Sequence, residues 1–175
     1  MFSKVLPLPI SFDQNEIFVV ITILIGSFIV FLLPKRFPGA ITILLLIEPG
    51  LVARISDHFL ASPQMLGSQY DLYDILDTGK VDFFDLITYF MYSPLGYIFI
   101  YIYDRYKTKG MYFTLYIFFS SLFATAFEWS AMKFKVFTYK HWNLSFSFIA
   151  YLITLSMSIL FLNLIKRLYK ARSRT

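Results

Sequence analysis

The chain has 175 residues, of which 58% are hydrophobic and 15% charged, with a formal net charge of +5 and a mean hydropathy of +0.64. This composition excludes an ordinary soluble domain and predicts a single integral membrane domain. The absence of cysteine excludes disulfides, thiolate metal sites and a cysteine nucleophile. The basic residues fall mostly between and after apolar runs, so we expect no nucleic-acid partner.

Apolar runs long enough to cross a bilayer predict an all-α, polytopic bundle of five transmembrane helices. The runs cover residues 17–33, 40–60, 83–103, 111–132 and 144–165. The first run is short and the second carries charges, so four spans are the alternative. Acidic residues precede the first run and it has no small-residue cleavage pattern, so we expect it to be retained as a span. The sequence PKRFPG, from Pro34 to Gly39, predicts a turn that makes the first two spans an antiparallel hairpin.

The Lys and Arg residues near the span ends predict the orientation of the bundle. Ten of them lie on the side of the membrane that holds the segment between the first and second spans, the segment between the third and fourth spans and the segment after the last span. Five lie on the other side. Positive charge is in excess on the cytoplasmic side, so we expect the N-terminus outside and the C-terminus inside. The sequence therefore predicts a multi-pass protein of the cell membrane, surrounded by membrane lipid.

The second span contains the polar stretch LLLIEPGLVARISDHF, from Leu44 to Phe59. Pro49 removes one helix hydrogen bond and Gly50 adds backbone freedom, so we expect a kink or a break just after Glu48. A charge near mid-membrane costs at least about 2.5 to 3.5 kcal/mol, so Glu48 should be paired, protonated or in a wet cavity. It is either a ligand-binding group or a structural partner that holds the bundle in register.

A second group of charges is expected near the outer end of the bundle. Arg54, Asp57 and His58 share one helix face, and Arg54 can pair with Asp57. Glu128 lies near the outer end of the fourth span, five residues before Lys133. We predict that these five side chains form one outward-facing polar cluster, in which all but Lys133 are candidates for binding a ligand or an ion.

The two long outer connections have opposite charge. Residues 69–85 carry five Asp and one Lys, whereas residues 133–142 carry three Lys, several aromatic residues and no acid. Asp71, Asp74 and Asp77 recur at a spacing of three, which predicts a short amphipathic helix at the membrane surface. We expect the acidic connection to face the basic and aromatic one, because each offsets the charge of the other.

The third span carries a polar face of its own. Asp82, Asp85, Tyr89 and Tyr92 recur three or four residues apart, so they line one side of a helix. They wall either a polar cavity that opens outward or an ordinary interior face. Pro94 predicts a further kink in this span.

Small residues form a stripe on each of the last two spans. The stripes comprise Ser120, Ser121, Ala124 and Thr125 on one span, and Ser147, Ala150, Thr154 and Ser158 on the other. Small side chains let helix backbones approach closely. The stripes therefore predict packing within the bundle, or against a helix of another membrane protein.

Motifs for specific chemistry are missing from the sequence. His58 and His141 lack the H-E-x-x-H spacing of a zinc site, so we expect no metal and no cofactor. The sequence contains neither a G-x-S-x-G elbow nor a Gly-rich phosphate loop, and the Asp series lacks the EF-hand pattern.

Two segments carry a resemblance. They are EWSAMKFKVFTYKHWNLSFSFIAYLI, from Glu128 to Ile153, and YDLYDILDTGKVDFFDLITYFMYSPLGYIFIYIYDR, from Tyr70 to Arg105. Through the Glu-Trp pair, the Tyr-x-x-Trp-Asn motif at Tyr139 and the aromatic last span, about two-thirds of the chain resembles uncharacterised small multipass membrane proteins of spore-forming Firmicutes. The resemblance implies a helical bundle in a bacterial cytoplasmic membrane and supplies no activity.

Three functions fit the sequence. The first is a non-enzymatic accessory, sensing or interaction subunit that uses the outward-facing polar cluster, and it requires no chemistry that the sequence lacks. The second is a small proton-coupled transporter that exchanges a proton at Glu48 or Glu128, although five spans without a repeat are few for alternating access. The third is a membrane enzyme acting on a lipid or isoprenoid, with Glu48 and Glu128 as acid and base in one cavity.

Overall fold

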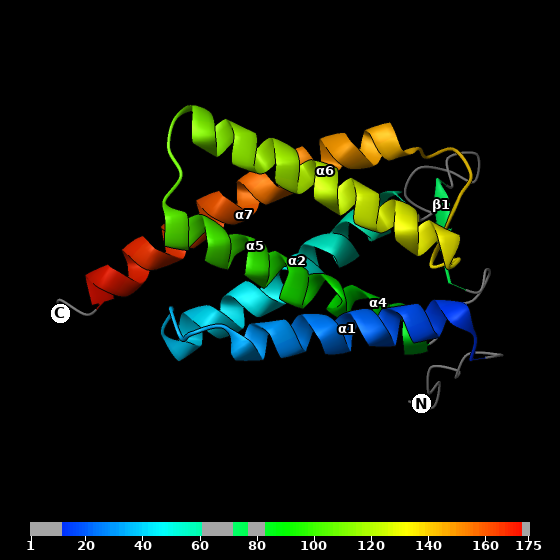
Figure 1. The fold of residues 1–175 in the computed structure, drawn as a ribbon, viewed down its shortest axis with the longest axis horizontal. Coiled ribbons are helices and arrows are strands. Elements are labelled where there is room, and N and C mark those ends of the chain that lie inside the picture. The colour runs from blue at the N-terminus through cyan, green and yellow to red at the C-terminus, as the bar shows by residue number, and fades with distance from the viewer. Residues whose placement is uncertain (1–11, 61–71, 77–82, 173–175) are drawn as a thin grey trace, which may run out of the picture.

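The structure, a computed structural model, describes residues 12–60, 72–76 and 83–172. Figure 1 shows long helices lying beside one another, with a small sheet at one end. The elements are α1 (Gln14–Leu32), α2 (Gly39–Leu60), β1 (Tyr73–Ile75), α4 (Phe83–Phe90), α5 (Tyr92–Tyr106), α6 (Met111–Lys133), β2 (Phe137–Tyr139) and α7 (Leu144–Arg172). Counting α4 and α5 as one span, the described residues contain five helical spans long and apolar enough to cross a membrane, as predicted.

The first span begins earlier than its apolar run because a capping box starts α1. The Asp13 side chain accepts a hydrogen bond from the backbone N–H of Asn15 at 3.2 Å, and the Glu16 carboxylate accepts one from the backbone N–H of Asp13 at 2.9 Å. These two bonds satisfy N–H groups that have no partner within the helix. Polar residues therefore form the first turn of α1.

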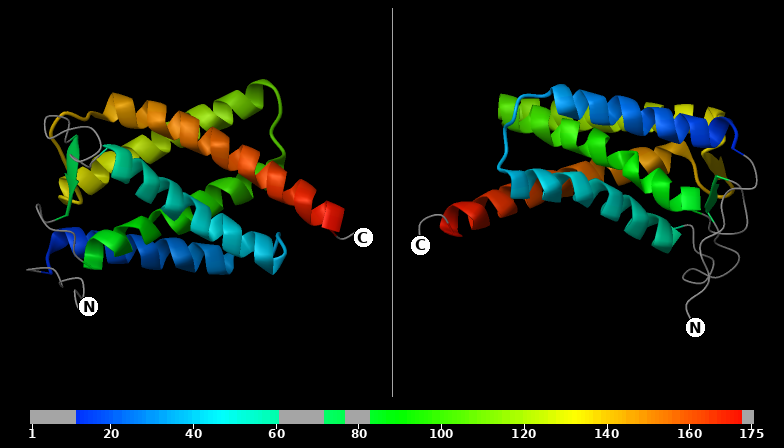
Figure 2. Two further views of the ribbon diagram at one scale, coloured as in Figure 1. Left: turned by 180° about the vertical axis from the view of Figure 1, so that it is seen from behind. Right: turned by 90° about the horizontal axis from the view of Figure 1, so that it is seen from below.

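Proline has different effects in the second and third spans. The third span is interrupted at Met91, because Pro94 has no N–H to donate to the carbonyl of Phe90, and the predicted kink is confirmed. In contrast, α2 continues through Pro49. Of the kink or break predicted just after Glu48, the structure excludes the break, and Figure 2 shows that the continuous α2 is bent.

Two crossings between a proline and a glycine hold α5 against α1 and α2. A Cβ atom built on Gly96 would lie 2.3 Å from Cγ of Pro49, and one built on Gly26 would lie 2.7 Å from Cγ of Pro94. Only glycine leaves room for a proline ring at these positions. Because lipid is as apolar as the helix surfaces, such close packing is a main source of helix association in a membrane.

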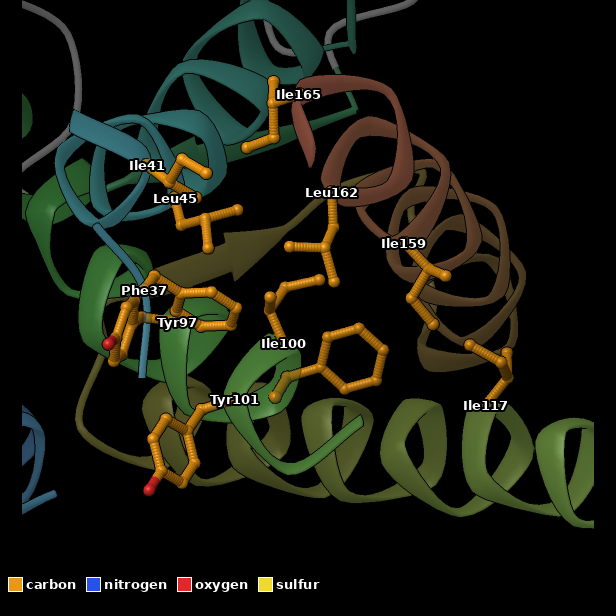
Figure 3. Close-up of a cluster of buried hydrophobic side chains, with 11 residues drawn as sticks. Phe37, Ile41, Leu45, Tyr97, Ile100, Tyr101, Ile117, Ile159, Leu162 and Ile165 are labelled. Carbon is orange, nitrogen blue, oxygen red and sulfur yellow. The ribbon is translucent and has the colours of Figure 1, made fainter. Parts of the chain in front are cut away.

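The bundle consists of two groups of helices. The first group contains α1, α2, α4 and α5, and the second is the antiparallel pair α6 and α7 (Figures 1 and 2). The two groups meet in a hydrophobic core cluster near the start of α2 and the end of α5, drawn in Figure 3. Its buried members are Phe37, Ile41, Leu45, Tyr97, Phe99, Ile100, Tyr101, Ile117, Ile159, Leu162 and Ile165. This core cluster closes that end of the bundle.

Three charged side chains lie at the same end. The Asp104 carboxylate accepts a hydrogen bond from Nε of Arg36 at 2.6 Å and forms an ion pair with Lys166. Arg36 also donates to the backbone carbonyl of Asp104 at 2.5 Å. Asp104 therefore ties α5 to the connection between α1 and α2 and to α7.

We expect Asp104→Asn to lower the free energy of unfolding by about 1 to 3 kcal/mol, because hydrogen bonds to charged groups contribute more than neutral ones and both cations lose their partner. Thermal denaturation in a mild detergent measures this change. The matched control is Arg105→Gln, at the adjacent exposed position. Equal stability of the two variants would show that the ion pairs contribute nothing.

The opposite end of the bundle carries the sheet. Strands β1 and β2 pair antiparallel, with Tyr73 opposite Tyr139, and Nζ of Lys140 lies 2.7 Å from the Asp74 carboxylate. The acidic and basic connections therefore face each other in their described parts, as expected.

The amphipathic helix predicted through Asp74 is wrong. Residues 73–75 instead satisfy their backbone groups by pairing with residues 137–139. The other members of the predicted face, Asp71 and Asp77, lie outside the described residues, as does Asp82.

Candidate functional site

A cavity of about 650 Å³ lies between the two groups of helices. It reaches the core cluster of Figure 3 through Phe99, and it reaches a second core cluster under the sheet through Tyr73 and Phe137. The volume is in the range of small-molecule binding sites. The two ends of the cavity differ in chemistry.

Most of the lining is apolar and aromatic. Two of these residues, Phe119 and Phe123 of α6, are also 60% and 67% exposed. Ile102 of α5 also lines the cavity and is partly exposed. In a helix of this length and composition, such exposed side chains face lipid. The cavity therefore reaches the lipid-facing surface between α5 and α6.

The end of the cavity near the sheet is polar. Its lining combines two carboxylates with hydroxyl and indole groups: Asp57, Tyr73, Tyr92, Glu128, Trp142, Ser147 and Tyr151. These residues come from α2, β1, α5, α6, α7 and the segment between β2 and α7. No Lys or Arg belongs to the described lining. We refer to these seven residues as the polar end.

Glu128 is the carboxylate with the most hydrogen bonds at the polar end. It is buried and accepts hydrogen bonds from the Tyr139 hydroxyl and, at 2.9 Å, from Oγ of Ser147. Ser147 in turn accepts from Nε1 of Trp142 at 2.7 Å. Asn143 places Ser147 in the first turn of α7, because its side chain accepts hydrogen bonds from the backbone N–H groups that begin this helix.

Asp57 is the second carboxylate at the polar end. It accepts a hydrogen bond from the Tyr73 hydroxyl and lies close enough to Glu128 for their charges to interact. Arg54 lies on the other side of Asp57, with its guanidinium 5.3 Å from the centre of the Tyr89 ring and 3.4 Å from the Tyr89 hydroxyl. Within the described part of the chain, neither Asp57 nor Glu128 forms an ion pair.

Of the five side chains predicted to form one polar cluster, the structure places Asp57 and Glu128 on one cavity, with Arg54 beside Asp57 but outside the lining. The predicted pairing of Arg54 with Asp57 is wrong, because Arg54 lies over Tyr89. His58 is exposed, and Nζ of Lys133 lies 5.3 Å from the centre of the Trp129 ring. The hydrogen-bond partners of the two carboxylates are hydroxyl groups, and Arg54 acts on Asp57 through its charge without forming an ion pair.

Glu48 is not among the lining residues of the cavity. Its Oε1 accepts a hydrogen bond from Oγ of Ser158 at 2.7 Å. Ser158 is a lining residue of the cavity. This bond links α2 to α7, which is the structural role considered for Glu48. The pair of carboxylates that lines one cavity is therefore Asp57 and Glu128, and not the pair Glu48 and Glu128 that the enzyme alternative requires.

The polar face predicted on the third span is divided. Tyr92 lines the cavity, whereas Tyr89 is buried against Arg54 on α2. Asp85 is buried in the first turn of α4. Of the described residues of this predicted face, only Tyr92 belongs to the cavity lining.

The small residues of α6 and α7 mostly face the cavity. Its lining includes Ser120, Ala124, Ser147, Ala150, Thr154 and Ser158. The two helices pack against each other, and the small side chains also leave the open volume beside them. Packing was the role predicted for these stripes, and no pattern in them indicated the cavity that they border.

Sequence reasoning missed Tyr73 and Tyr139, which lie opposite each other in the sheet and donate to the two carboxylates. Burial and the adjacent Asp57 carboxylate raise the pKa of Tyr73, and burial and the adjacent Glu128 carboxylate raise the pKa of Tyr139. Both phenols therefore remain protonated hydrogen-bond donors at neutral pH.

These raised pKa values predict a loss of stability at alkaline pH. The folded state binds the two phenolic protons more tightly than the unfolded state, whose tyrosines have a pKa of about 10. Their contribution is complete below about pH 10 and is lost as the pH rises further. We expect the thermal midpoint of the variant Tyr73→Phe/Tyr139→Phe to fall less between pH 9 and 11 than that of the wild type, with exposed Tyr112→Phe as control. Parallel pH profiles for all three proteins would contradict this assignment.

The polar end can accept protons and hydrogen bonds and can bind positive charge. Among the described residues, no group of three or more His, Asp or Glu side chains is placed to hold a metal ion. Comparison of the chain with protein-family models, with curated proteins and with solved structures finds no match.

Proposed function

We propose that this protein binds one amphipathic lipid molecule in the cavity. We further propose that it lies in a bacterial cytoplasmic membrane and serves there as a sensing or accessory subunit. In this proposal the sheet lies at the outer end and the charged group around Asp104 at the inner end, which agrees with the excess of Lys and Arg on that side. The observation that carries the proposal is the cavity itself, which is polar at one end, mostly apolar along the rest and lined in part by exposed side chains.

The position of the opening supports a ligand from the bilayer. Phe119 and Phe123 belong both to the cavity lining and to the lipid-facing surface, so an apolar chain can pass between α5 and α6 without crossing water. The head of the same molecule would lie at the polar end, where Tyr73 and Phe137 of the sheet cover it. An amphipathic molecule matches this division of the lining.

The same geometry favours lipid binding over transport. A carrier needs a polar path that can open to either side of the membrane. In the described residues, the cavity lining is polar near the sheet, and apolar residues of the core cluster lie beyond its other end. Lipid binding requires only an opening toward the bilayer, and the exposed lining residues Phe119 and Phe123 support one.

A second candidate function is a membrane enzyme acting on the lipid head group. It is favoured by one observation, that Asp57 and Glu128 both line the cavity and interact electrostatically. Two carboxyl groups in a dry site can hold different protonation states and act as acid and base. If this candidate is correct, purified protein changes the mass of a lipid in a membrane extract, whereas Asp57→Asn binds the same lipid without changing it.

Lipid binding can be tested by fluorescence, because Trp142 lines the cavity and the chain contains two Trp. The other, Trp129, is half exposed on α6. In a Trp129→Phe variant, we expect a lipid with brominated chains to quench Trp142 and to saturate at one equivalent of lipid per chain. The matched variant Trp142→Phe reports on exposed Trp129, whose quenching should follow the bromine content of the micelle without saturating. Unsaturable quenching in both variants would overturn the proposal.

A further inference from the structure

We infer that Glu128 binds the ammonium group of an amphipathic ligand at the polar end. This inference rests on the proposed lipid binding and adds the chemistry of the head group. Three features of the described residues carry it: the charge balance of the cavity, the aromatic rings at its polar end and the arrangement of the two carboxylates.

The first feature is that Glu128 lies in the cavity without a cation. The residue is 9% exposed, and its hydrogen-bond partners Tyr139 and Ser147 are neutral. Arg54 lies beside Asp57 and does not belong to the lining. A carboxylate buried without a counter-charge is destabilising, so a cationic ligand gains affinity by supplying that charge.

The second feature is independent of charge and concerns the rings around the carboxylate. Tyr73, Tyr92, Tyr151 and Trp142 line the same end of the cavity, and the centres of the Tyr73 and Trp142 rings are 6.0 Å apart. The faces of aromatic rings attract cations, and proteins use groups of such rings to bind quaternary ammonium ligands. Rings beside a carboxylate are therefore suited to an alkylammonium head.

The third feature is the presence of Asp57 beside Glu128. Two carboxylates in one cavity repel a phosphate or sulfate head, and no Lys or Arg of the described lining offsets that repulsion. An uncharged alcohol gains hydrogen bonds without balancing the charge. The site therefore discriminates in the order ammonium, alcohol, phosphate. The ammonium has two sources in a membrane, a simple long-chain amine and a zwitterionic phospholipid.

The test is displacement of the brominated lipid from the Trp129→Phe variant by three probes with the same C12 chain: dodecyltrimethylammonium, dodecanol and dodecyl phosphate. We expect the ammonium probe to displace the lipid at a concentration about tenfold lower than the alcohol, which corresponds to about 1.4 kcal/mol. Glu128→Gln keeps a hydrogen-bond acceptor but removes the negative charge, so it should reduce this ratio to below about twofold. Glu48→Gln, outside the lining, should keep the tenfold ratio.

The possible outcomes separate the two proposals. If the lipid binds saturably but dodecanol or dodecyl phosphate displaces it as well as the ammonium probe does, the inference is overturned and lipid binding stands. If no lipid binds saturably, the proposed function fails and the inference fails with it. The ratio between the displacing concentrations of dodecanol and the ammonium probe is measured in the Trp129→Phe variant, in which Glu128 is unchanged. It therefore tests the ammonium preference even if Glu128→Gln does not fold. A short-chain phosphatidylcholine added to the same assay shows whether the ammonium of a phospholipid is accepted equally well.

Discussion

Gly96→Val is expected to prevent the bundle from assembling. A Cβ atom at this position would lie 2.3 Å from Cγ and 2.6 Å from Cβ of Pro49, far inside van der Waals contact. The proline ring is rigid and fixed in the α2 backbone, so the two helices themselves must separate. Overpacking in a protein interior costs about 1 to 3 kcal/mol, and the rigidity of this contact places the effect at or above the upper end. The measurement is the fraction of folded, monodisperse protein in a mild detergent, together with its thermal midpoint.

Two further variants identify the cause. Gly39→Val is the matched control, because a Cβ atom at Gly39 meets nothing within 4 Å. Combining the milder Gly96→Ala with Pro49→Ala should restore part of the stability that Gly96→Ala loses, since the clash needs both partners. If Gly96→Val folds as well as Gly39→Val, the crossing between α2 and α5 is not where the structure places it.

Ala124→Phe is expected to abolish lipid binding while the protein still folds. Ala124 of α6 lines the cavity, and a phenyl ring there occupies space that the lipid chain needs. Filling a cavity usually preserves or raises stability, so this variant separates binding from folding. We expect affinity for the brominated lipid to fall at least about tenfold, measured as quenching of Trp142 in the Trp129→Phe background.

The matched control for this variant lies two residues further along the same helix. Ala126 is exposed and does not belong to the cavity lining, so Ala126→Phe adds the same ring on the outside of the bundle. It should bind the brominated lipid as the parent protein does. Equal loss of binding in both variants, or full binding in Ala124→Phe, would show that the lipid does not occupy this cavity.

The number and approximate limits of the helical spans follow from the sequence, because length and hydropathy alone determine which runs can cross a membrane. The sequence does not show how the helices lie against each other. Pro49 illustrates the difference: its effect on the backbone predicts a kink or a break, but not that its ring packs against Gly96 while α2 continues. A single residue has both effects, and only its neighbours decide which one prevails.

The candidate site was predictable in part. Asp57 and Glu128 stood out as charges in apolar spans, and the structure places both on one cavity. Tyr73 and Tyr139 did not stand out, because their role depends on pairing between strands that are far apart in the sequence. The spacing of three between Asp71, Asp74 and Asp77 predicted a helix where the structure has strand β1. Long-range pairing of short strands leaves little local signal in a sequence.

The most direct test of this account is native mass spectrometry of the full chain purified in a mild non-ionic detergent, with Ala124→Phe and Ala126→Phe measured beside the wild type. The account predicts one lipid molecule retained per chain in the wild type and in Ala126→Phe, and none in Ala124→Phe. Release and fragmentation of that lipid would identify its head group. Absence of retained lipid from the wild type, or equal retention in all three proteins, would contradict the assignment of the cavity as a lipid-binding site.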